Sequence, residues 1–490
     1  MPSLEEHLRK TTRQFTNPLA EEAALGLARD LLRALVLAHA AAPPRYPGLD
    51  AAAIGYEAGA ASLPETSQNA SASEDLFELG ALLNSLVQNR PAQVAWRLDG
   101  PPAFPASTIL RGAFLAALGS PQPEARFDSA PAALAAAEAA IQEPSRPRRT
   151  ALFRVDAARS GVASPDPARG ASRVWTVPLG PVAAAPVVTE DLVLAATADG
   201  RLVFLDRGTG RLLHETKLGS AVESSPALAG GKLFVGTDDG DLVSVDAHSG
   251  AVLFRARLGQ LIRSAPLPLD DRVVVGVVDG KAGALIALDA VTGKPAWKAK
   301  LGPVFSSPAL AGERVIVGSD DGSVHAFDKQ TGALAWSHAL GAKVRATPVV
   351  AGEVVIVADF AGRVAALALS DGAPRWKRET TAAIYSSPCV AQGLAITANN
   401  EGVVHATDAA NGAPGFALVT GGPVVASVSS LGTTFVVAST DGALYLIDPQ
   451  GALTARVDAQ SGAIHATPAF DGGELFVGAE RGLVAMRIER

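Results

Sequence analysis

The sequence has a single cysteine, no excess of either charge and no long uninterrupted apolar run. Cys389 alone cannot form an intramolecular disulfide, nor can it supply the several thiolates of an iron–sulfur or multi-cysteine zinc site. The longest uncharged stretch, residues 409–440, is interrupted by Gly, Pro, Ser and Thr. It therefore predicts short strands and turns rather than a membrane-spanning helix, and we expect no integral membrane segment.

Neither sign of charge dominates the chain. Its 42 Lys and Arg against 49 Asp and Glu give a net charge of −7 at pH 7. This balance offers no domain-wide basic surface for nucleic acid or anionic lipid. The first ten residues, MPSLEEHLRK, lack the basic cap and apolar core of a signal peptide. We therefore expect a cytoplasmic protein without a nucleic-acid partner, and a periplasmic location is the alternative.

A fixed repeat organises the C-terminal two thirds of the sequence. A turn glycine recurs in steps of 40 residues, with one step of 42, at Gly200, Gly240, Gly280, Gly322, Gly362, Gly402, Gly442 and Gly482. Each unit contains four short strand-like pieces separated by turns, as between Val304 and Gly341. Such units fill residues 171–490 and predict a β-propeller of eight four-stranded blades.

A second turn in the repeat, Asp-x-x-Thr/Ser-Gly, is followed by a large planar side chain. This side chain stands four residues after the turn glycine, at His214, Phe254, Trp297, Trp336, Trp376 and Phe416. We expect it to pack on an adjacent blade. The last unit lacks a fourth strand, whereas the array opens with an isolated strand that contains Trp175. The strand of Trp175 should therefore complete the last blade and close the ring, hiding its edges.

The pattern Asp-x-x-Thr-Gly-x-x-x-Trp, at 289–297 and 328–336, resembles the PQQ-type propeller repeat. That family includes quinoprotein alcohol dehydrogenases and a non-catalytic lipoprotein of outer-membrane assembly. Resemblance to the dehydrogenases implies calcium ligands and an adjacent cysteine pair, which Cys389 alone cannot provide. Resemblance to the lipoprotein implies export behind a lipobox cysteine, for which this N-terminus has no counterpart. We expect no cofactor and no metal.

Residues 1–145 differ from the repeat region. They are rich in Ala and Leu with helical spacing, and they predict an α-helical domain. Residues 146–170 are rich in Pro, Arg and Gly, and they predict a linker. The expected fold class is therefore α+β multidomain, an α-helical domain followed by an all-β eight-bladed propeller at 171–490.

Two segments of the N-terminal region resemble parts of the protein-kinase C-lobe. Residues 73–91 match a pattern Asp-x-Phe-x-Leu-Gly that ends before a turn proline, through Asp75, Phe77, Leu79, Gly80 and Pro91. Residues 118–134 match a later Pro-x-x-Arg-Phe-x-Ser-Ala pattern, and Pro64-Glu65 stands where Pro-Glu of A-P-E would fall. The resemblance, over about 18–141, implies a structural ion pair between Glu65 and Arg126.

The same resemblance implies a domain without kinase activity. Gly48 stands at the catalytic base and Ala53 at the metal-binding Asn of H-R-D-L-x-x-x-N, and neither side chain can do that chemistry. No D-F-G precedes Glu65, and the chain before the first helix is too short for a Gly-rich loop. A generic Ala-rich helical bundle is the alternative, and it is also non-catalytic.

One position varies freely within the regular framework of the repeat. It follows the leading Val or Ile of each Ser-Ser-Pro element and holds Ala183, Glu223, Arg263, Phe305, Arg345, Tyr385, Val425 and His465. Equivalent packing positions should stay alike, so this variation predicts exposure around one mouth of the channel. Arg and aromatic residues often anchor interfaces, and Arg263, Arg345 and Tyr385 are candidates for gripping a carboxylate-bearing peptide. The alternative is that these exposed positions vary without any functional role.

These observations predict a non-enzymatic, bacterial scaffold that binds another protein through the propeller face and the channel mouth. A small-molecule sensor, or an enzyme with its ligand in the channel, is a second hypothesis, favoured by the Arg and aromatic residues. A periplasmic factor of outer-membrane assembly is a third, and it requires an export route.

Overall fold

The computed structural model describes residues 55–57, 60–62, 152–154, 156–164, 167–247 and 249–489. The chain divides into two compact units, Met1–Pro147 and Arg148–Arg490. From the first unit, the described residues are a two-stranded antiparallel hairpin in which β1 (Gly55–Glu57) pairs with β2 (Ala60–Ser62).

The expected α+β fold class is wrong, because the described residues are all-β and include no helix. The hairpin of β1 and β2 lies inside the range that was predicted to be α-helical. Gly55 and Gly59 weaken helical propensity there, and Tyr56 favours an extended backbone. The other N-terminal predictions, namely the kinase-like segments, Glu65 with Arg126, Gly48 and Ala53, lie outside the described residues.

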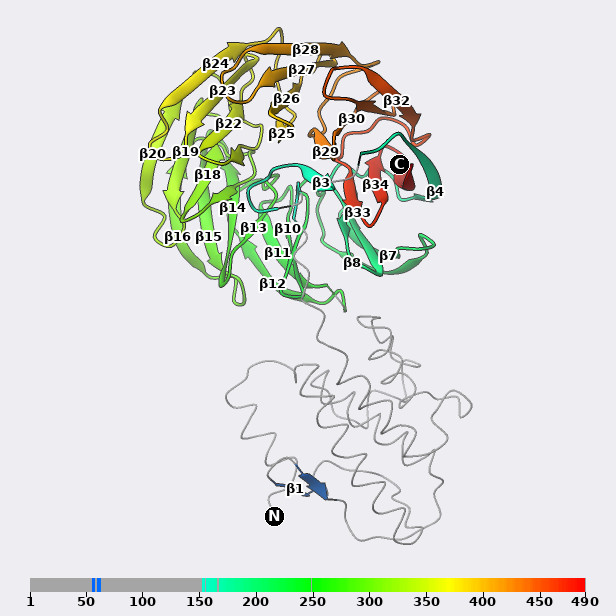
Figure 1. The fold of residues 1–490 in the computed structure, drawn as a ribbon. Coiled ribbons are helices and arrows are strands. Elements are labelled where there is room, and N and C mark those ends of the chain that lie inside the picture. Colours follow the sequence, from blue (N-terminus) through cyan, green and yellow to red (C-terminus); the bar gives the residue numbers. More distant parts are fainter. Residues whose placement is uncertain are drawn as a thin grey trace. The chain divides into compact units, whose positions relative to one another are not determined.

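The second unit is a ring of eight antiparallel blades around a central channel (Figure 1). Blade 1 comprises β5 (Val187–Val188), β6 (Leu192–Ala196), β7 (Arg201–Asp206) and β8 (Leu212–Lys217). Blade 2 comprises β9 (Ala227–Ala229), β10 (Lys232–Gly236), β11 (Asp241–Asp246) and β12 (Val252–Arg257). Blade 3 comprises β13 (Leu267–Pro268), β14 (Arg272–Asp279), β15 (Ala282–Asp289) and β16 (Pro295–Leu301). Blade 4 comprises β17 (Ala309–Ala311), β18 (Arg314–Gly318), β19 (Ser323–Asp328) and β20 (Leu334–Ala339).

The remaining blades repeat this order from the channel outward. Blade 5 comprises β21 (Val349–Ala351), β22 (Val354–Ala358), β23 (Arg363–Ala368) and β24 (Pro374–Glu379). Blade 6 comprises β25 (Cys389–Ala391), β26 (Leu394–Ala398), β27 (Val403–Asp408) and β28 (Pro414–Val419). Blade 7 comprises β29 (Ser429–Leu431), β30 (Thr434–Ala438), β31 (Ala443–Ile447) and β32 (Leu453–Asp458), with β3 (Val162–Ser164) added at its inner edge. Blade 8 comprises β33 (Ala469–Asp471), β34 (Glu474–Ala479), β35 (Gly482–Glu489) and β4 (Gly170–Pro178).

The burial of each strand follows its place in the blade. Second and third strands such as β18 and β19 are buried on both faces, because they lie between two neighbouring blades. They are accordingly near-continuous apolar runs. Outer strands such as β20 alternate between more and less exposed residues, because the rim of the ring faces solvent.

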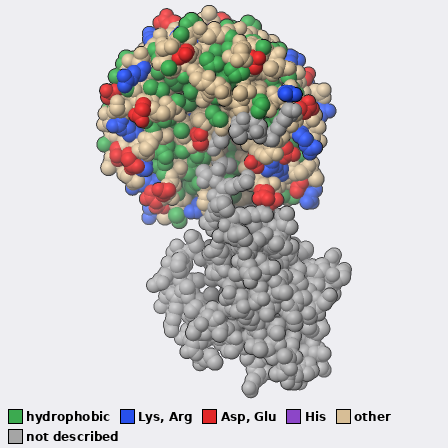
Figure 2. All heavy atoms as spheres, viewed as in Figure 1, with side chains coloured by type: hydrophobic (Ala, Val, Ile, Leu, Met, Phe, Trp, Pro, Cys, Tyr) green, Lys and Arg blue, Asp and Glu red, His purple; other side chains and the backbone are tan. Residues whose placement is uncertain are grey.

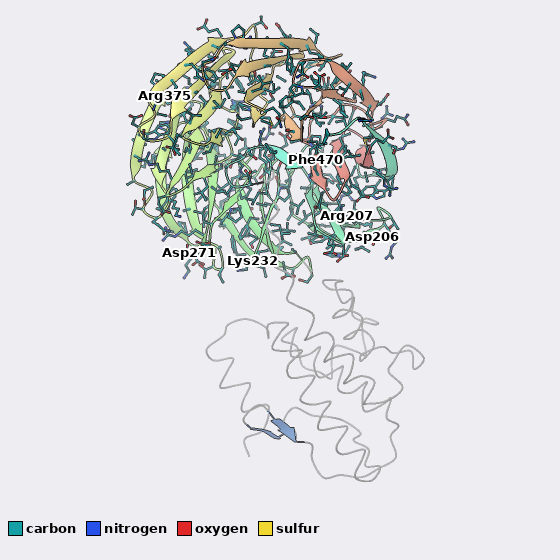
Figure 3. All side chains as sticks on the ribbon, in the orientation of Figure 1. Asp206, Arg207, Lys232, Asp271, Arg375 and Phe470 are labelled. Carbon is teal, nitrogen blue, oxygen red and sulfur yellow. The ribbon has the colours of Figure 1, made fainter. Side chains whose placement is uncertain are left out.

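The strand of Trp175 closes the ring, as predicted. β4 pairs antiparallel with β35 and places Trp175 opposite Ala485. Arg207 of blade 1, labelled in Figure 3, contacts blade 8 from the other side of this junction. Its Nη1 lies 2.6 Å from Asp471 Oδ2 and its Nε lies 3.0 Å from Glu474 Oε2. The pairing of β4 with β35 and the ion pairs of Arg207 each connect residues that are far apart in sequence, and together they close the ring between blade 8 and blade 1.

The planar side chains of the outer strands pack on the next blade, also as predicted. The Nε1 atoms of Trp297, Trp336 and Trp376 donate hydrogen bonds of 3.0–3.1 Å to carbonyls in the following blade. The ring of Trp297 lies on Gly332, where an added Cβ would stand 2.6 Å from the indole. Gly332 also has φ of 69°, so both close approach and backbone conformation favour glycine there.

A belt of hydroxyl groups explains the Ser-Ser-Pro element of the repeat. The backbone N–H of one blade donates to a Ser or Thr oxygen of the next: Ala265 to Ser307 (2.9 Å), Thr347 to Ser387 (3.0 Å) and Ser427 to Thr467 (2.9 Å). These bonds are buried around the channel and connect neighbouring blades. The element is therefore a structural link that fixes the blades against one another.

Replacing Trp336 by Ala should lower the free energy of unfolding by about 3–5 kcal/mol, because a buried indole and its hydrogen bond are lost. Trp336→Phe should lose much less, since Phe254 and Phe416 occupy the equivalent position in other blades. Urea denaturation measures both values. Equal losses for Phe and Ala would contradict packing between blades as the role of this position.

His214 occupies the same position in blade 1, where it stacks on Phe204 at 3.9 Å and where burial lowers its pKa. The unfolded chain therefore takes up this proton first, and stability declines as the pH falls below the ordinary His value of about 6.5. His214→Phe keeps the packing and removes the titration. The melting temperature of the variant should fall less than that of the wild type between about pH 7.5 and about pH 5.5. Identical pH profiles would contradict this assignment.

Candidate functional site

The eight variable residues lie on the loops that lead from each outer strand into the next inner strand. All eight are exposed or partly exposed, and the residues on either side of them in the sequence are buried. Phe305, for example, stands between Val304 and Ser306, both completely buried. Since these loops surround one end of the channel, we call Ala183, Glu223, Arg263, Phe305, Arg345, Tyr385, Val425 and His465 the mouth residues.

Arg263 is the centre of a charged group at the mouth. Its Nη2 lies 2.8 Å from Asp238 Oδ2 and its Nε 3.2 Å from Asp238 Oδ1, while its Nη1 lies 2.8 Å from Glu223 Oε2. The hydrogen bond with Asp238 is the main reason that the pKa of Arg263 is raised. Burial raises the pKa of Glu223, and the charge of Arg263 opposes that shift.

Arg345 is the centre of an aromatic group at the mouth. Its Nε and Nη2 donate to the two carboxylate oxygens of Asp320 at 2.9 and 2.7 Å. Its guanidinium carbon lies 3.9 Å from the ring centroid of Phe305 and 5.0 Å from that of Phe360. The rings of Phe360 and Tyr385 are 4.2 Å apart, and Tyr385 is 40% exposed. The two hydrogen bonds to Asp320 fix the plane of the Arg345 guanidinium, so Arg345 and the rings of Phe305 and Phe360 form a preorganised cation–π stack.

Three residues of these groups were not anticipated from the sequence: Asp238, Asp320 and Phe360. Each lies in the hairpin between the second and third strands of its blade and is next to a mouth loop of the following blade. Asp238 and Asp320 stand 25 residues before the arginine that each one binds. This repeated offset is the sequence signal that would have paired them.

These pairings change what the mouth can bind. The guanidinium groups of Arg263 and Arg345 already hold carboxylates of this chain, so a carboxylate of a ligand would compete with Asp238 and Asp320. The aromatic surfaces of Phe305 and Tyr385 are partly exposed beside them. The mouth therefore offers an aromatic group around Arg345 and a charged group around Arg263, both partly exposed.

The channel itself contains a segment of the same chain. Residues 152–164, which we call the channel segment, belong to the range predicted to be a linker. Carbonyls of Ala157 and Ala158 accept hydrogen bonds from Leu310 (2.7 Å) and Val350 (3.1 Å) on inner strands. β3 pairs parallel with β29 and lies at the centre of the ring (Figure 1). These described residues are therefore bound inside the propeller and are not a solvated linker.

Two arginines of the channel segment are buried, Arg154 with 4% exposure and Arg159 with none. Burial lowers the pKa of Arg154 to about 10 and that of Arg159 to about 9, so both stay charged at neutral pH. Among the described residues neither has an ion pair with a carboxylate. Their hydrogen bonds go to backbone carbonyls.

The residues around the channel do not fit a quinone cofactor. The channel segment lies between the inner strands and is hydrogen-bonded to them, and the one cysteine of the sequence, Cys389, is buried. Burial raises the pKa of the Cys389 thiol to about 12, which keeps it protonated. His325 pairs with Asp321, 3.1 Å away, and the described residues contain no group of three or more potential metal ligands.

The face of the propeller in Figure 2 carries interspersed acidic and basic side chains without a large area of one sign. A cavity of about 580 Å³ between blades 3 and 4 is open to solvent and is lined by Lys300, Asp321, His325 and Ser337 among others. Within the described ranges, no helix has the length and hydropathy needed to cross a bilayer.

Comparison with known proteins agrees with this architecture. The family model described as "Outer membrane protein assembly factor BamB" matches residues 152–228 and 215–417, which together span more than half of the chain. The chain belongs to this family of PQQ-like propellers. The match begins at residue 152, so it includes the channel segment. No curated protein matches the chain.

Solved structures share the fold of this family member at low identity. BamB from Moraxella catarrhalis is 20% identical with a TM-score of 0.56, over 65% of this chain and 100% of that chain. The quinohemoprotein alcohol dehydrogenase ADHIIG from Pseudomonas putida HK5 is 15% identical with a TM-score of 0.60, over 70% and 80%. The designed protein Ika8 is 18% identical with a TM-score of 0.58, over 65% and 100%. An assembly factor, an enzyme and a design share the architecture, so the fold alone does not assign an activity.

Arg345→Ala should lower the free energy of unfolding by about 1–3 kcal/mol, because Asp320, with a side chain 7% exposed, loses its two charged hydrogen bonds. Asp320→Asn should cost much less in the Arg345→Ala background than in the wild type. A double-mutant cycle measures this coupling. The exposed pair Lys377–Glu379 is the matched control and should show almost no coupling. Equal coupling in both pairs would contradict the assignment.

Proposed function

We propose that this protein is a non-enzymatic scaffold that binds another protein at the channel mouth. The observation that carries the proposal is the group of Phe305, Arg345, Phe360 and Tyr385, stacked and partly exposed on a rigid ring. Aromatic residues and Arg are enriched among the residues that dominate binding energy at protein interfaces. Their fixed geometry reduces the entropy lost on binding.

The channel segment favours a protein partner over a small ligand held deep in the channel. Its backbone occupies the space between the inner strands, so a ligand at the mouth contacts a broad surface rather than an enclosed pocket. Small-molecule sites are usually concave and enclose most of the ligand. The surface around the mouth therefore suits a protein loop or peptide better than a metabolite.

A more specific role is favoured by the family match. The matching model is described as an outer membrane protein assembly factor, and such a role would place this chain in the cell envelope rather than in the expected cytoplasm. Fractionation of the native organism distinguishes the two locations. Recovery in the periplasmic or membrane fraction supports the assembly role, whereas recovery with cytoplasmic markers contradicts it and leaves the scaffold proposal in place.

The scaffold proposal is tested by placing a photo-crosslinking amino acid at Tyr385 in the full chain in its native organism. The matched control carries the same group at Val291, which is 55% exposed on a hairpin at the opposite end of a blade. A protein crosslinked from position 385 and not from 291 is the expected result. Crosslinks that are identical at both positions, or absent at 385, would contradict binding at the mouth.

The partner identified in this way should lose affinity when the aromatic group is removed. Phe360→Asn and Tyr385→Val introduce the residues that the next blade carries at these positions, Asn400 and Val425, so the fold should tolerate them. We expect the double variant to bind about tenfold or more weakly, as measured by calorimetry. If the double variant keeps both the dissociation constant and the melting temperature of the wild type, the partner binds at another surface.

A further inference from the structure

The buried arginines of the channel segment are held in a way that the proposed function does not explain. A buried cation usually needs a carboxylate partner, because the loss of hydration otherwise costs free energy. Arg154 and Arg159 have no such ion pair among the described residues, yet all three nitrogens of each guanidinium donate hydrogen bonds. The negative charge of Asp156 acts on both groups without an ion pair, and the direct contacts of both guanidinium groups are with carbonyl dipoles.

Arg159 is bound by two blades and by its own segment. Its Nε donates to Pro308 O at 3.0 Å, its Nη2 to Pro266 O at 3.0 Å and to Ala265 O at 3.4 Å. Its Nη1 donates to Phe153 O at 2.6 Å. The acceptors come from blades 3 and 4 and surround the planar group in the directions of its N–H bonds.

Arg154 is bound in the same manner by blade 6. Its Nη1 donates to Ser387 O at 2.8 Å, its Nη2 to Pro388 O, and its Nε to Arg159 O at 3.0 Å. Both arginines have left-handed backbones, with φ of 60° and 59°. This conformation is unfavourable for a residue with a Cβ, so the surrounding contacts must hold it.

The repeat explains why the channel wall accepts so many donors. The inner strands have one edge without a neighbouring strand, and such an edge presents both N–H and C=O groups. A proline begins this edge in most blades, at Pro186, Pro226, Pro266, Pro308, Pro348, Pro388 and Pro468. Since proline has no N–H, the wall at this level is rich in acceptors and poor in donors. A group with five N–H donors and no acceptor is complementary to that wall.

We propose that the carbonyls at the proline-flanked starts of the inner strands form a guanidinium-binding site, which Arg154 and Arg159 occupy as intramolecular ligands. The site is selective for the planar fork of a guanidinium over a compact ammonium, because each bound group donates from all three nitrogens to separate carbonyls, including those of blades 3 and 4 for Arg159 and those of blade 6 for Arg154. It is distinct from the mouth residues and does not depend on the protein partner proposed for them.

The site is tested by chemical rescue in the full-length protein. Arg159→Ala removes one guanidinium and should lower the melting temperature by several degrees. Methylguanidinium, at concentrations far below those that denature proteins, should restore part of this loss by occupying the vacated acceptors. Methylammonium is the matched control of equal charge, and Arg159→Lys is the matched variant. Neither should restore the stability of the wild type.

The single cysteine supplies a second measurement. Cys389 follows Pro388, whose carbonyl accepts from Arg154, and its thiol is buried. Arg154→Ala should increase the rate at which a thiol reagent labels Cys389 several-fold, and methylguanidinium should slow the labelling again. This readout uses a different variant, so it remains informative if Arg159→Ala does not fold.

Each result bears on the proposal. A guanidinium site is supported if methylguanidinium stabilises the alanine variants and methylammonium does not. Methylguanidinium should also leave the wild type unchanged. Equal effects of the two cations, or equal effects on wild type and variants, would overturn the proposal. Wild-type stability and wild-type labelling in both alanine variants would also overturn it, because the arginines would then contribute nothing to the channel.

Discussion

The pairing of β4 with β35 is the contact on which the rest of the propeller depends. A ring of blades has no edge only if its first and last strands share a sheet, and here the strand of Trp175 supplies the fourth strand of blade 8. Arg207 strengthens the same seam through Asp471 and Glu474. Closure also brings the mouth residues of all eight repeats to one end of a single channel.

Closure has a second effect through the chain that precedes β4. The channel segment comes directly before the closing strand, so one continuous stretch binds the centre of the ring and then its rim. Its carbonyls and guanidinium groups reach the inner strands of several blades. The acceptor-rich wall and the hydroxyl belt arise from the same Ser-Ser-Pro element, which therefore serves both the packing between blades and the filling of the channel.

The propeller was predictable because its signals are local and repeated. Turn glycines and planar side chains recur about every 40 residues, and the strand of Trp175 is the one that the last unit lacks, so each signal has one structural interpretation. The exposure of the mouth residues followed from the same alignment, since wide variation at one position contrasts with neighbours that are always Val or Ile on one side and Ala or Ser on the other. Whether that surface binds a partner remains a prediction that the crosslinking experiment addresses.

Other features depend on contacts that no local pattern contains. The channel segment has the composition of a linker, and its burial follows from carbonyls more than 100 residues away. The pairing of Arg345 with Asp320 joins neighbouring blades, and its sequence signal, the 25-residue offset shared with Arg263 and Asp238, gains its meaning once the blades are placed side by side. The expected α+β fold class is wrong because the described part of the Ala-rich N-terminal range is the hairpin of β1 and β2, where Gly55 and Gly59 beside Tyr56 oppose a helix.

The position of the channel segment has a mechanical consequence. Tension applied from the chain that precedes residue 152 reaches the hydrogen bonds at the centre of the ring before it reaches the sheet of β4 and β35. The buried guanidinium groups and the short parallel pairing of β3 with β29 therefore bear the load first. The pairing of β4 with β35, which closes the propeller, therefore experiences a pulling force only after the contacts of the channel segment have broken.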